Sequence, residues 1–367
     1  MTAAEERWTA ARRLAELPSP LLDWYGRNAR VLPWREEPTP YRVWLSEIML
    51  QQTRVEAGKP YFQRFVERLP TVAALAEADE GLLLKLWEGL GYYSRVRNLQ
   101  KAARVVMKDY GGVLPSDPAE LQKLPGIGAY TAGAIASIAF GVPVPAVDGN
   151  VLRVAARVLD DHRDVLDPKV KKEFEALVAG VIPRDRAGDF NQSLMELGAT
   201  VCLPNGAPLC GGCPVAHLCL GRQSGEAPRL PVKAPKAARK ARSLTVLLLT
   251  CGPLAAIRQR PPKGLLASLW EFPLEEGCLD SAEVLALAGR YGLSPAGVPR
   301  DLGLSEHVFT HIKWEMRGWA LEVAEPFSIP GLVWATLDEL EGVYALPSAY
   351  RAYTARLPEL LSGSGKF

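Results

Sequence analysis

Residues 124–150 read Leu-Pro-Gly-Ile-Gly-Ala-Tyr-Thr-Ala, then an apolar run to Phe140, then Gly-Val-Pro-Val-Pro-Ala-Val-Asp-Gly-Asn. Gly126 and Gly128 let the backbone turn tightly and point N–H groups at an anion on the next helix N-terminus, which suits a phosphate. Gly141 ends that helix, and an extended Pro-Val-Pro run leads to Asp148, where a new helix can begin. Taken alone, the glycine segment also fits an ordinary helix–helix turn, and Asp148 also fits an ordinary N-cap.

A second carboxylate, Glu47, lies in an earlier apolar run. A helix is predicted from about Pro40 through Thr53, and Val, Trp, Leu, Ile and Met surround Glu47 within it. Such a carboxylate is either on a solvated face or buried with a raised pKa. We favour burial because apolar residues flank it on both sides.

Four of the six cysteines, Cys202, Cys210, Cys213 and Cys219, are spaced C-x7-C-x2-C-x5-C. In a chain of this size without a secretory signal, a tight cluster indicates metal or iron–sulfur ligation more than disulfides. The spacing contains only one short Cys-x-x-Cys hook. It leaves zinc and a [4Fe–4S] cluster equally open.

The chain of 367 residues, 48% of them hydrophobic, is long enough for two cores. We expect a mainly α region at 1–225, a basic, proline-rich and exposed linker at 226–242, and a smaller α+β domain at 243–367. The net charge is only +2, but the linker carries six basic residues, which suits contact with a phosphate backbone. Helices are expected over 14–25, 98–110, 151–159, 169–178 and 190–201, and strands over 244–250 and 319–323.

The first residues are polar and acidic, with no apolar run behind them. This pattern predicts neither a signal peptide nor a membrane span. We therefore expect a cytoplasmic protein with no membrane partner.

A further motif, residues 86–97, places Gly89, Gly91, Tyr92 and Tyr93 before an arginine-rich helix start. It fits a packed loop with two aromatic anchors. It equally fits aromatic side chains that stack on or insert between bases, with arginines at the phosphates.

Together these motifs resemble the MutY-type adenine DNA glycosylases of the helix-hairpin-helix base-excision superfamily. The resemblance covers about residues 20–220 and rests on the following segments in family order: 32–35, 46–53, 89–95, the hairpin at 124–130, Asp148-Gly149-Asn150 and the four cysteines. It implies a mainly α glycosylase with an iron–sulfur loop of four cysteines, a [4Fe–4S] cluster and a Nudix-like C-terminal domain. The first cysteine gap is seven residues where the family usually has six, a difference that bears on the loop geometry more than on the identity of the ligands.

By the same resemblance, the enzyme removes adenine mispaired with 8-oxoguanine or G from double-stranded DNA, as a monomer that searches the bacterial nucleoid. Glu47 would protonate adenine N7, and Asp148, kept ionised by the helix that it caps, would stabilise the oxocarbenium-like sugar. Tyr130 and Asn150 would orient Asp148 and the sugar. Endonuclease III-like relatives have a lysine where this chain has Tyr130, and a tyrosine cannot form an imine.

The resemblance also assigns binding roles. The residues implied to contact DNA or the lesion are Gln52, Thr53, Leu90, Tyr92, Gly126, Gly128, Phe309, Thr310 and His311. Those implied to line the adenine pocket are Arg30, Trp34, Arg35 and Gln192. Thr310 stands where the family often has serine, and the hydroxyl is retained. His307 and His311 could instead form a metal pair or lie on the surface.

Two alternatives stay open. One is a bifunctional endonuclease III-like glycosylase and lyase that acts on oxidised pyrimidines. The other is a non-catalytic DNA-binding module. In the C-terminal domain, the segment that would hold a Nudix hydrolase's metal lacks the necessary cluster of glutamates, so we expect no nucleotide hydrolysis.

Overall fold

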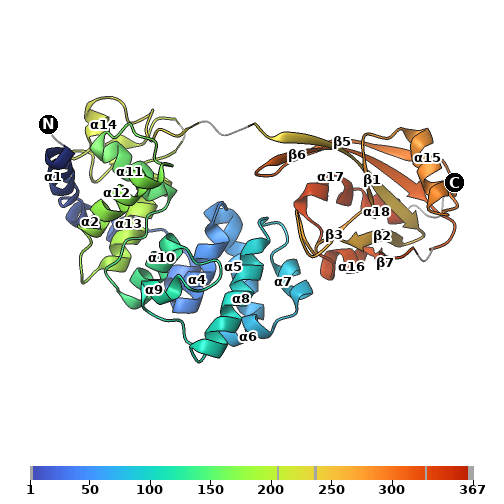
Figure 1. Ribbon diagram of the computed structural model, residues 1–367, viewed down its shortest axis with the longest axis horizontal. Helices are drawn as coiled ribbons and strands as arrows, with labels where there is room; N and C mark the ends of the chain where they lie inside the picture. The colour runs from blue at the N-terminus through green and yellow to red at the C-terminus, as the bar shows by residue number, and fades with distance from the viewer. Residues whose placement is uncertain (1–2, 205, 235–237, 327–328, 363–367) are drawn as a thin grey trace. The chain divides into compact units, whose positions relative to one another are not determined.

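The computed structural model describes residues 3–204, 206–234, 238–326 and 329–362 (Figure 1). The chain forms two compact units, one of Met1–Glu77 with Arg97–Pro235, the other of Ala78–Val96 with Lys236–Phe367. The segment 78–96 thus groups with the C-terminal residues, a feature absent from the contiguous domains expected from the sequence. Patterns along the chain do not reveal this grouping, because it depends on contacts between distant residues.

The first unit is helical. Its helices in chain order are α1 (Ala3–Leu14), α2 (Pro18–Asn28), α3 (Pro33–Glu36), α4 (Pro40–Leu50), α5 (Val55–Arg68), α6 (Val72–Glu77), α8 (Ser94–Asp109, whose first turn lies in the other unit), α9 (Pro118–Leu121), α10 (Ala129–Phe140), α11 (Gly149–Leu159), α12 (Pro168–Ala179), α13 (Ala187–Thr200), the 3₁₀ turn η1 (Cys210–Gly212) and α14 (Leu220–Gln223).

Prolines begin several of these helices, because a helix's first turn has no use for the missing N–H. The predicted helix from Pro40 is shorter than expected: α4 ends at Leu50, and Gln52 has a left-handed φ of 58°. The α10 helix is apolar on nearly every face and packs against both α4 and α13. It is therefore the central helix around which the neighbouring helices are arranged.

The second unit is α+β. Its elements are α7 (Glu80–Leu86), β1 (Lys240–Cys251), β2 (Leu254–Gln259), β3 (Trp270–Glu271), β4 (Leu274–Glu276), α15 (Ser281–Arg290), β5 (Arg300–Val308), β6 (Ile312–Glu322), β7 (Leu332–Thr336), α16 (Leu337–Gly342), the 3₁₀ turn η2 (Ser348–Tyr350), α17 (Arg351–Thr354) and α18 (Leu357–Ser362).

One seven-stranded mixed sheet organises this unit, with main order β3-β2-β1-β6-β5, while β4 pairs with β1 and β7 with β2. The β1 and β6 strands run parallel, from Lys240 opposite Ile312 to Thr250 opposite Glu322. The leucines of β1 enter two cores, one shared with α17 and α18 and one shared with α15. Because both faces are covered, the apolar run at 244–250 is continuous rather than alternating.

The predicted linker is wrong in its first half. Ala227 and Leu230 are 3% and 2% exposed, and the Arg157 guanidinium donates to the Leu230 carbonyl at 2.9 Å. Val165 also donates its N–H to the Val232 carbonyl at 3.2 Å. These contacts hold residues 227–232 on the helical unit, which the proline and lysine content alone did not reveal. Residues 235–237 lie outside the described part of the chain.

Within the described residues, no helix has the length and apolarity needed to cross a bilayer.

Candidate active site

A cavity of about 750 Å³ in the helical unit brings together residues that are far apart in the sequence. Its lining includes all four predicted catalytic residues and all four predicted pocket residues, together with Gln52 and Thr53. They come from α3, α4, α10, α11 and α13 and from the turns beside those helices. A cleft lined by apolar walls and a few convergent polar groups is typical of a small-molecule or flipped-base site.

Glu47 occupies the wall of this cavity on α4. Its pKa is raised to about 7, mainly because the carboxyl group is buried and also because of the charge of Asp148, while a hydrogen bond from the Tyr130 hydroxyl and the charge of Arg35 oppose the shift. The half-buried position of Glu47 on the cavity wall and the raised pKa follow the direction that the sequence predicted. Such a group is shared between its protonated and ionised forms near neutral pH and can donate a proton.

Asp148 is the N-cap of α11. Its Oδ1 accepts the backbone N–H groups of Asn150 and Val151, both at 2.8 Å, and its Oδ2 accepts the Asn150 side-chain amide at 2.6 Å. Burial raises the pKa of Asp148, although these hydrogen bonds and the charge of Arg153 oppose the rise. The helix cap alone would lower the pKa of Asp148, but the loss of solvent around the carboxylate outweighs the effect of the cap.

Tyr130 differs from its expected role. The resemblance implied that it orients Asp148, but its hydroxyl donates to Glu47 Oε2 and lies 3.8 Å from Met195 Sδ. Burial, followed by the charges of Glu47 and Asp148, raises the pKa of Tyr130 well above its ordinary value. In the structure Asn150 forms the hydrogen bond to Asp148, whereas Tyr130 forms one to Glu47.

Glu196 of α13 is a site residue that the sequence reasoning missed. Its buried carboxylate accepts two bonds from the Arg30 side chain, at 2.6 and 3.0 Å, and one from Arg35 Nη2 at 2.9 Å. Burial would raise its pKa, but these two arginines hold it below its ordinary range. An acid within an apolar helix, as at Glu47, was the available signal.

The predicted adenine-pocket residues form a connected wall around this carboxylate. Arg35 Nε donates to Gln192 Oε1 at 3.1 Å, and Arg35 Nη1 donates to the Arg30 carbonyl at 3.1 Å. Trp34 is buried edge-on against Phe62, with ring centres 5.4 Å apart. Lys171 of α12 also lines the cavity and was not predicted.

Arg153 connects the catalytic turn to the cysteine loop. Its guanidinium donates to Asn150 Oδ1 at 2.8 Å, to the Gly198 carbonyl at 2.7 Å and to the Cys202 carbonyl at 2.8 Å. Gly198 permits this close packing, because a Cβ there would lie 2.5 Å from the Asn150 Cβ. The amide that bonds Asp148 is thus fixed by the same side chain that holds the cysteine loop.

All four clustered cysteines line one small apolar hollow beside α11. The pKa of Cys213 is raised to about 11 and that of Cys219 is also raised, by burial first and then by the other thiols of the cluster. Arg157 Nη1 lies 3.1 Å from Cys202 Sγ. Four thiols gathered on one hollow, with the Arg157 cation beside Cys202, fit a positively charged metal group that would hold them as thiolates.

The hairpin has the geometry expected of its glycines. Gly126 has a left-handed φ of 81°, and a Cβ there would lie 2.8 Å from the Asn98 Cβ. Gly128 is the N-cap of α10 and has no side chain to cap it. The turn therefore leaves the start of α10 open to an approaching phosphate.

The remaining predicted lesion contacts lie in the second unit. Thr310 and His311 are exposed, and Tyr92 is 45% exposed with a left-handed φ of 48°. Phe309 packs edge-on against His307 and Trp314, at 4.6 and 4.9 Å between ring centres. Leu90 is only 9% exposed.

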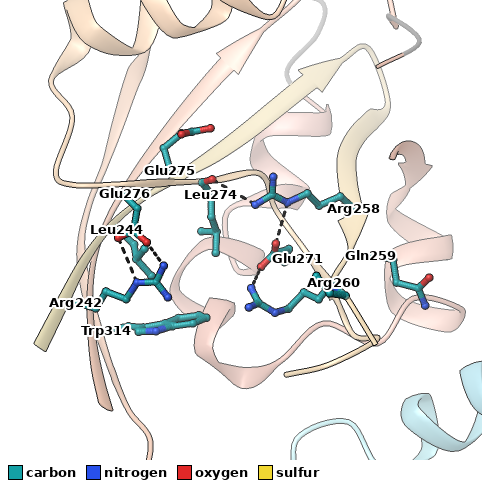
Figure 2. A pocket seen from close by; sticks show the side chains of 11 residues that line it. Arg242, Leu244, Arg258, Gln259, Arg260, Glu271, Leu274, Glu275, Glu276 and Trp314 are labelled. Atoms are coloured by element: carbon teal, nitrogen blue, oxygen red, sulfur yellow. Dashed lines mark hydrogen bonds and ion pairs between the residues drawn. The ribbon is translucent and has the colours of Figure 1, made fainter. Parts of the chain in front are cut away.

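A second cavity, of about 510 Å³, opens on the sheet of this unit (Figure 2). Figure 2 shows Arg258 and Arg260 directed at Glu271, and Arg242 at Glu276. Glu275 is the third carboxylate of the lining, so the lining contains three arginines and three glutamates. The charges balance, and this cavity therefore has no excess positive charge for an anion.

Comparisons with known proteins agree with both units. The model of the HhH-GPD superfamily base excision DNA repair proteins matches residues 45–179, and the model of the NUDIX domain matches residues 245–356. The adenine DNA glycosylase of Homo sapiens is 38% identical over 410 residues, covering 94% of this chain and 75% of the human protein. That of Arabidopsis thaliana is 40% identical over 348 residues, covering 80% of this chain and 55% of the plant protein.

Solved structures resemble the helical unit. A thermostable thymine-DNA glycosylase has a TM-score of 0.52 and 27% identity, covering 59% of this chain and 98% of its own. A trapped endonuclease III–DNA covalent intermediate has a TM-score of 0.50 and 26% identity, with the same two coverages.

The raised pKa of Glu47 predicts a pH-dependent gain in stability for Glu47→Gln. Above the ordinary pKa of 4.5, the unfolded chain ionises Glu47 before the folded protein does, so the carboxyl costs the fold stability until about pH 7. The variant should match the parent near pH 4.5 and exceed it by about 3 kcal/mol above pH 7. Denaturant unfolding at both pH values measures this difference. The exposed Glu67→Gln is the control, and a gain that does not depend on pH would contradict the assignment.

Proposed function

Because this chain belongs to the adenine DNA glycosylases of the HhH-GPD superfamily of base excision DNA repair proteins, we propose that it excises adenine mispaired with 8-oxoguanine and leaves the strand intact. Adenine opposite G is the slower substrate. The observation that carries the proposal is the meeting of Glu47, Asp148 and Tyr130 in one cavity. Two carboxylates support base release, and a tyrosine in place of lysine supports a reaction that ends at the abasic site.

Base release needs a proton donor, because adenine leaves poorly as an anion. The flipped adenine enters the cavity with N7 towards Glu47, whose raised pKa keeps part of the population protonated. Tyr130 holds that carboxyl group in place through its hydroxyl. The Glu196 network of Arg30 and Arg35 supports the rest of the pocket, with Gln192 and Trp34 as its walls.

Asp148 serves the sugar. As the C1′–N9 bond breaks, positive charge develops on the deoxyribose, and an ionised Asp148 stabilises it electrostatically or covalently. Asn150 and the start of α11 hold both carboxylate oxygens in position. Water then completes the hydrolysis at C1′.

DNA outside the pocket is held by backbone and lesion contacts. The hairpin glycines Gly126 and Gly128 receive a phosphate at the start of α10, Gln52 enters the base stack opened by the flipped adenine, and Thr53 contacts the DNA. In the C-terminal unit, Tyr92 is the second residue that enters the base stack. Phe309, Thr310 and His311 read the lesion base. The chain acts as a monomer.

The rival enzyme is a lyase, and one assay separates the two. An A:8-oxoguanine duplex is incubated in single turnover, and each sample is analysed with and without alkali. We expect strand breaks only after alkali, and no base loss in Asp148→Asn. Breaks without alkali that appear as fast as base loss would reject the monofunctional proposal, and full excision by Asp148→Asn would reject Asp148 as the stabilising group.

The two carboxylates also predict a bell-shaped pH dependence. Excision needs a neutral Glu47 and an ionised Asp148, so the rate falls above about pH 7 as Glu47 loses its proton and falls in acid as Asp148 gains one. The alkaline limb should lose about tenfold per pH unit. Single-turnover rates, with DNA binding measured in parallel, test this. A rate that stays constant through the alkaline range would remove Glu47 as the proton donor.

The cysteine hollow supports a [4Fe–4S] cluster held by Cys202, Cys210, Cys213 and Cys219. All four cysteines line one hollow. Four cysteine thiolates are the usual ligand set of a [4Fe–4S] cluster. The cluster holds the loop after α13 in place when bound.

The purified protein should therefore contain about four iron atoms per chain and absorb visible light. Metal analysis and a visible spectrum check this. Cys251→Ser, outside the cluster, is the control and should leave the iron content unchanged, whereas Cys213→Ser should lower it. A colourless, zinc-loaded and active protein would overturn the assignment.

A further inference from the structure

The short helix α7 is fastened to the C-terminal residues of its own unit by Lys85. The Lys85 ammonium donates to the Leu340 carbonyl at 3.0 Å and to the Tyr344 carbonyl at 3.1 Å. Leu340 lies in the last turn of α16, where carbonyls lack helical partners and a cation is favoured, and Tyr344 follows just after the helix ends. The Lys85 side chain is only 16% exposed, so the contact is largely sheltered from solvent.

Glu88, one turn later, completes the attachment. Its Oε1 accepts the backbone N–H of Leu346 at 2.7 Å, and its Oε2 lies 2.6 Å from the Lys85 ammonium. Lys85 and Glu88 thus pair with each other and also bind three backbone groups of residues 340–346. An ordinary surface ion pair of the same spacing would make the ion pair but none of the three backbone contacts.

The loop that follows is rigid and carries Tyr92. Trp87 is fully buried and donates its indole N–H to the Gly91 carbonyl at 3.1 Å. Arg95 donates to the Leu90 and Gly91 carbonyls, both at 3.1 Å, and lies 5.5 Å from the Tyr92 ring centre. Because the backbone is held on both sides, the exposed Tyr92 ring has a defined position.

At the tip of this loop the two lesion-reading elements meet. The Thr310 hydroxyl donates to the Tyr92 hydroxyl at 3.3 Å, across 218 positions of sequence. Thr310 belongs to the turn between β5 and β6, while Tyr92 belongs to the segment that Lys85 and Glu88 fasten. The attachment and the Tyr92–Thr310 contact are therefore parts of one arrangement.

We infer that Lys85 and Glu88 are positioning residues that set the distance between Tyr92 and Thr310 and so determine how well the enzyme distinguishes 8-oxoguanine from G opposite adenine. The inference rests on the proposed function, since it assigns Tyr92 and Thr310 to the lesion base. Neither Lys85 nor Glu88 touches the substrate. A small displacement of Tyr92 weakens contacts that only 8-oxoguanine completes, whereas the chemistry at Glu47 and Asp148 is left unchanged.

The first test compares excision from A:8-oxoguanine and A:G duplexes in single turnover. Lys85→Met should lower the preference for A:8-oxoguanine about five- to tenfold, mainly through slower excision from that duplex. Lys85→Arg should keep most of the preference, because a guanidinium can also donate to two carbonyls. Lys59→Met is the matched control, since Lys59 pairs with Glu56 at 2.8 Å with the same spacing, and it should leave the preference unchanged.

A charge-swapped double variant, Lys85→Glu with Glu88→Lys, separates attachment from simple pairing. It keeps the ion pair but cannot donate from position 85 to the carbonyls or accept the Leu346 N–H at position 88. We expect the preference to stay low. Full recovery in this variant would overturn the inference, as would equal losses by Lys85→Met on both duplexes.

Hydrogen exchange of the DNA-free protein tests the attachment without depending on excision. Lys85→Met should speed amide exchange both in residues 87–93 and in residues 308–311. Lys59→Met should leave exchange in both segments unchanged. Unchanged exchange would overturn the inference even if the parent prefers A:8-oxoguanine. Faster exchange in both segments, with a parent that shows no such preference, would instead reject the proposed function and leave the attachment standing.

Discussion

The proposed chemistry depends on the partial exclusion of water from one carboxyl group. Glu47 is shielded by the apolar side chains of α4 and its neighbours, and this desolvation raises its pKa to about 7. A hydrogen bond from Tyr130 keeps the group in place without cancelling the shift. The same helix α10 carries Tyr130 and begins at the hairpin glycines, so the proposed base chemistry and phosphate contact share one helix.

Two arginine networks hold the rest of the cavity around that acid. Glu196 binds Arg30 and Arg35, and Arg153 binds Asn150, Gly198 and Cys202. Each network joins segments that are distant in the sequence. Removing one partner would leave a buried charge or polar group unpaired, which is costly in a sheltered site.

The C-terminal unit has a NUDIX-like sheet whose nearby charged side chains are largely paired with one another. The acidic Glu283 of α15 is engaged in the capping box with Asp280, and the charged lining of the sheet cavity is balanced between arginines and glutamates. The turn at Thr310 and the loop at Tyr92 are exposed in this unit. The proposed function assigns the contact with the lesion base to these two elements.

The sequence alone determined the family and the fold class, and it named many, though not all, of the residues that line the cavity. The resemblance is confirmed by relatives at 35–40% identity, and the mainly α region with a smaller NUDIX-like domain is confirmed as well. Local patterns sufficed because apolar periodicity, prolines and glycines act on neighbouring residues: α10 and α11 lie within two residues of their predicted limits. The glycine turn and the cap at Asp148 follow from the same local rules.

Only the tertiary structure decided which side chains meet. It gave Tyr130 to Glu47 rather than to Asp148, introduced Glu196 as the partner of two predicted pocket residues, buried Leu90, and held the first half of the linker on the helical unit. It also grouped residues 78–96 with the C-terminal unit. These outcomes depend on packing and desolvation between segments up to 259 positions apart, and no pattern within a single segment encodes them.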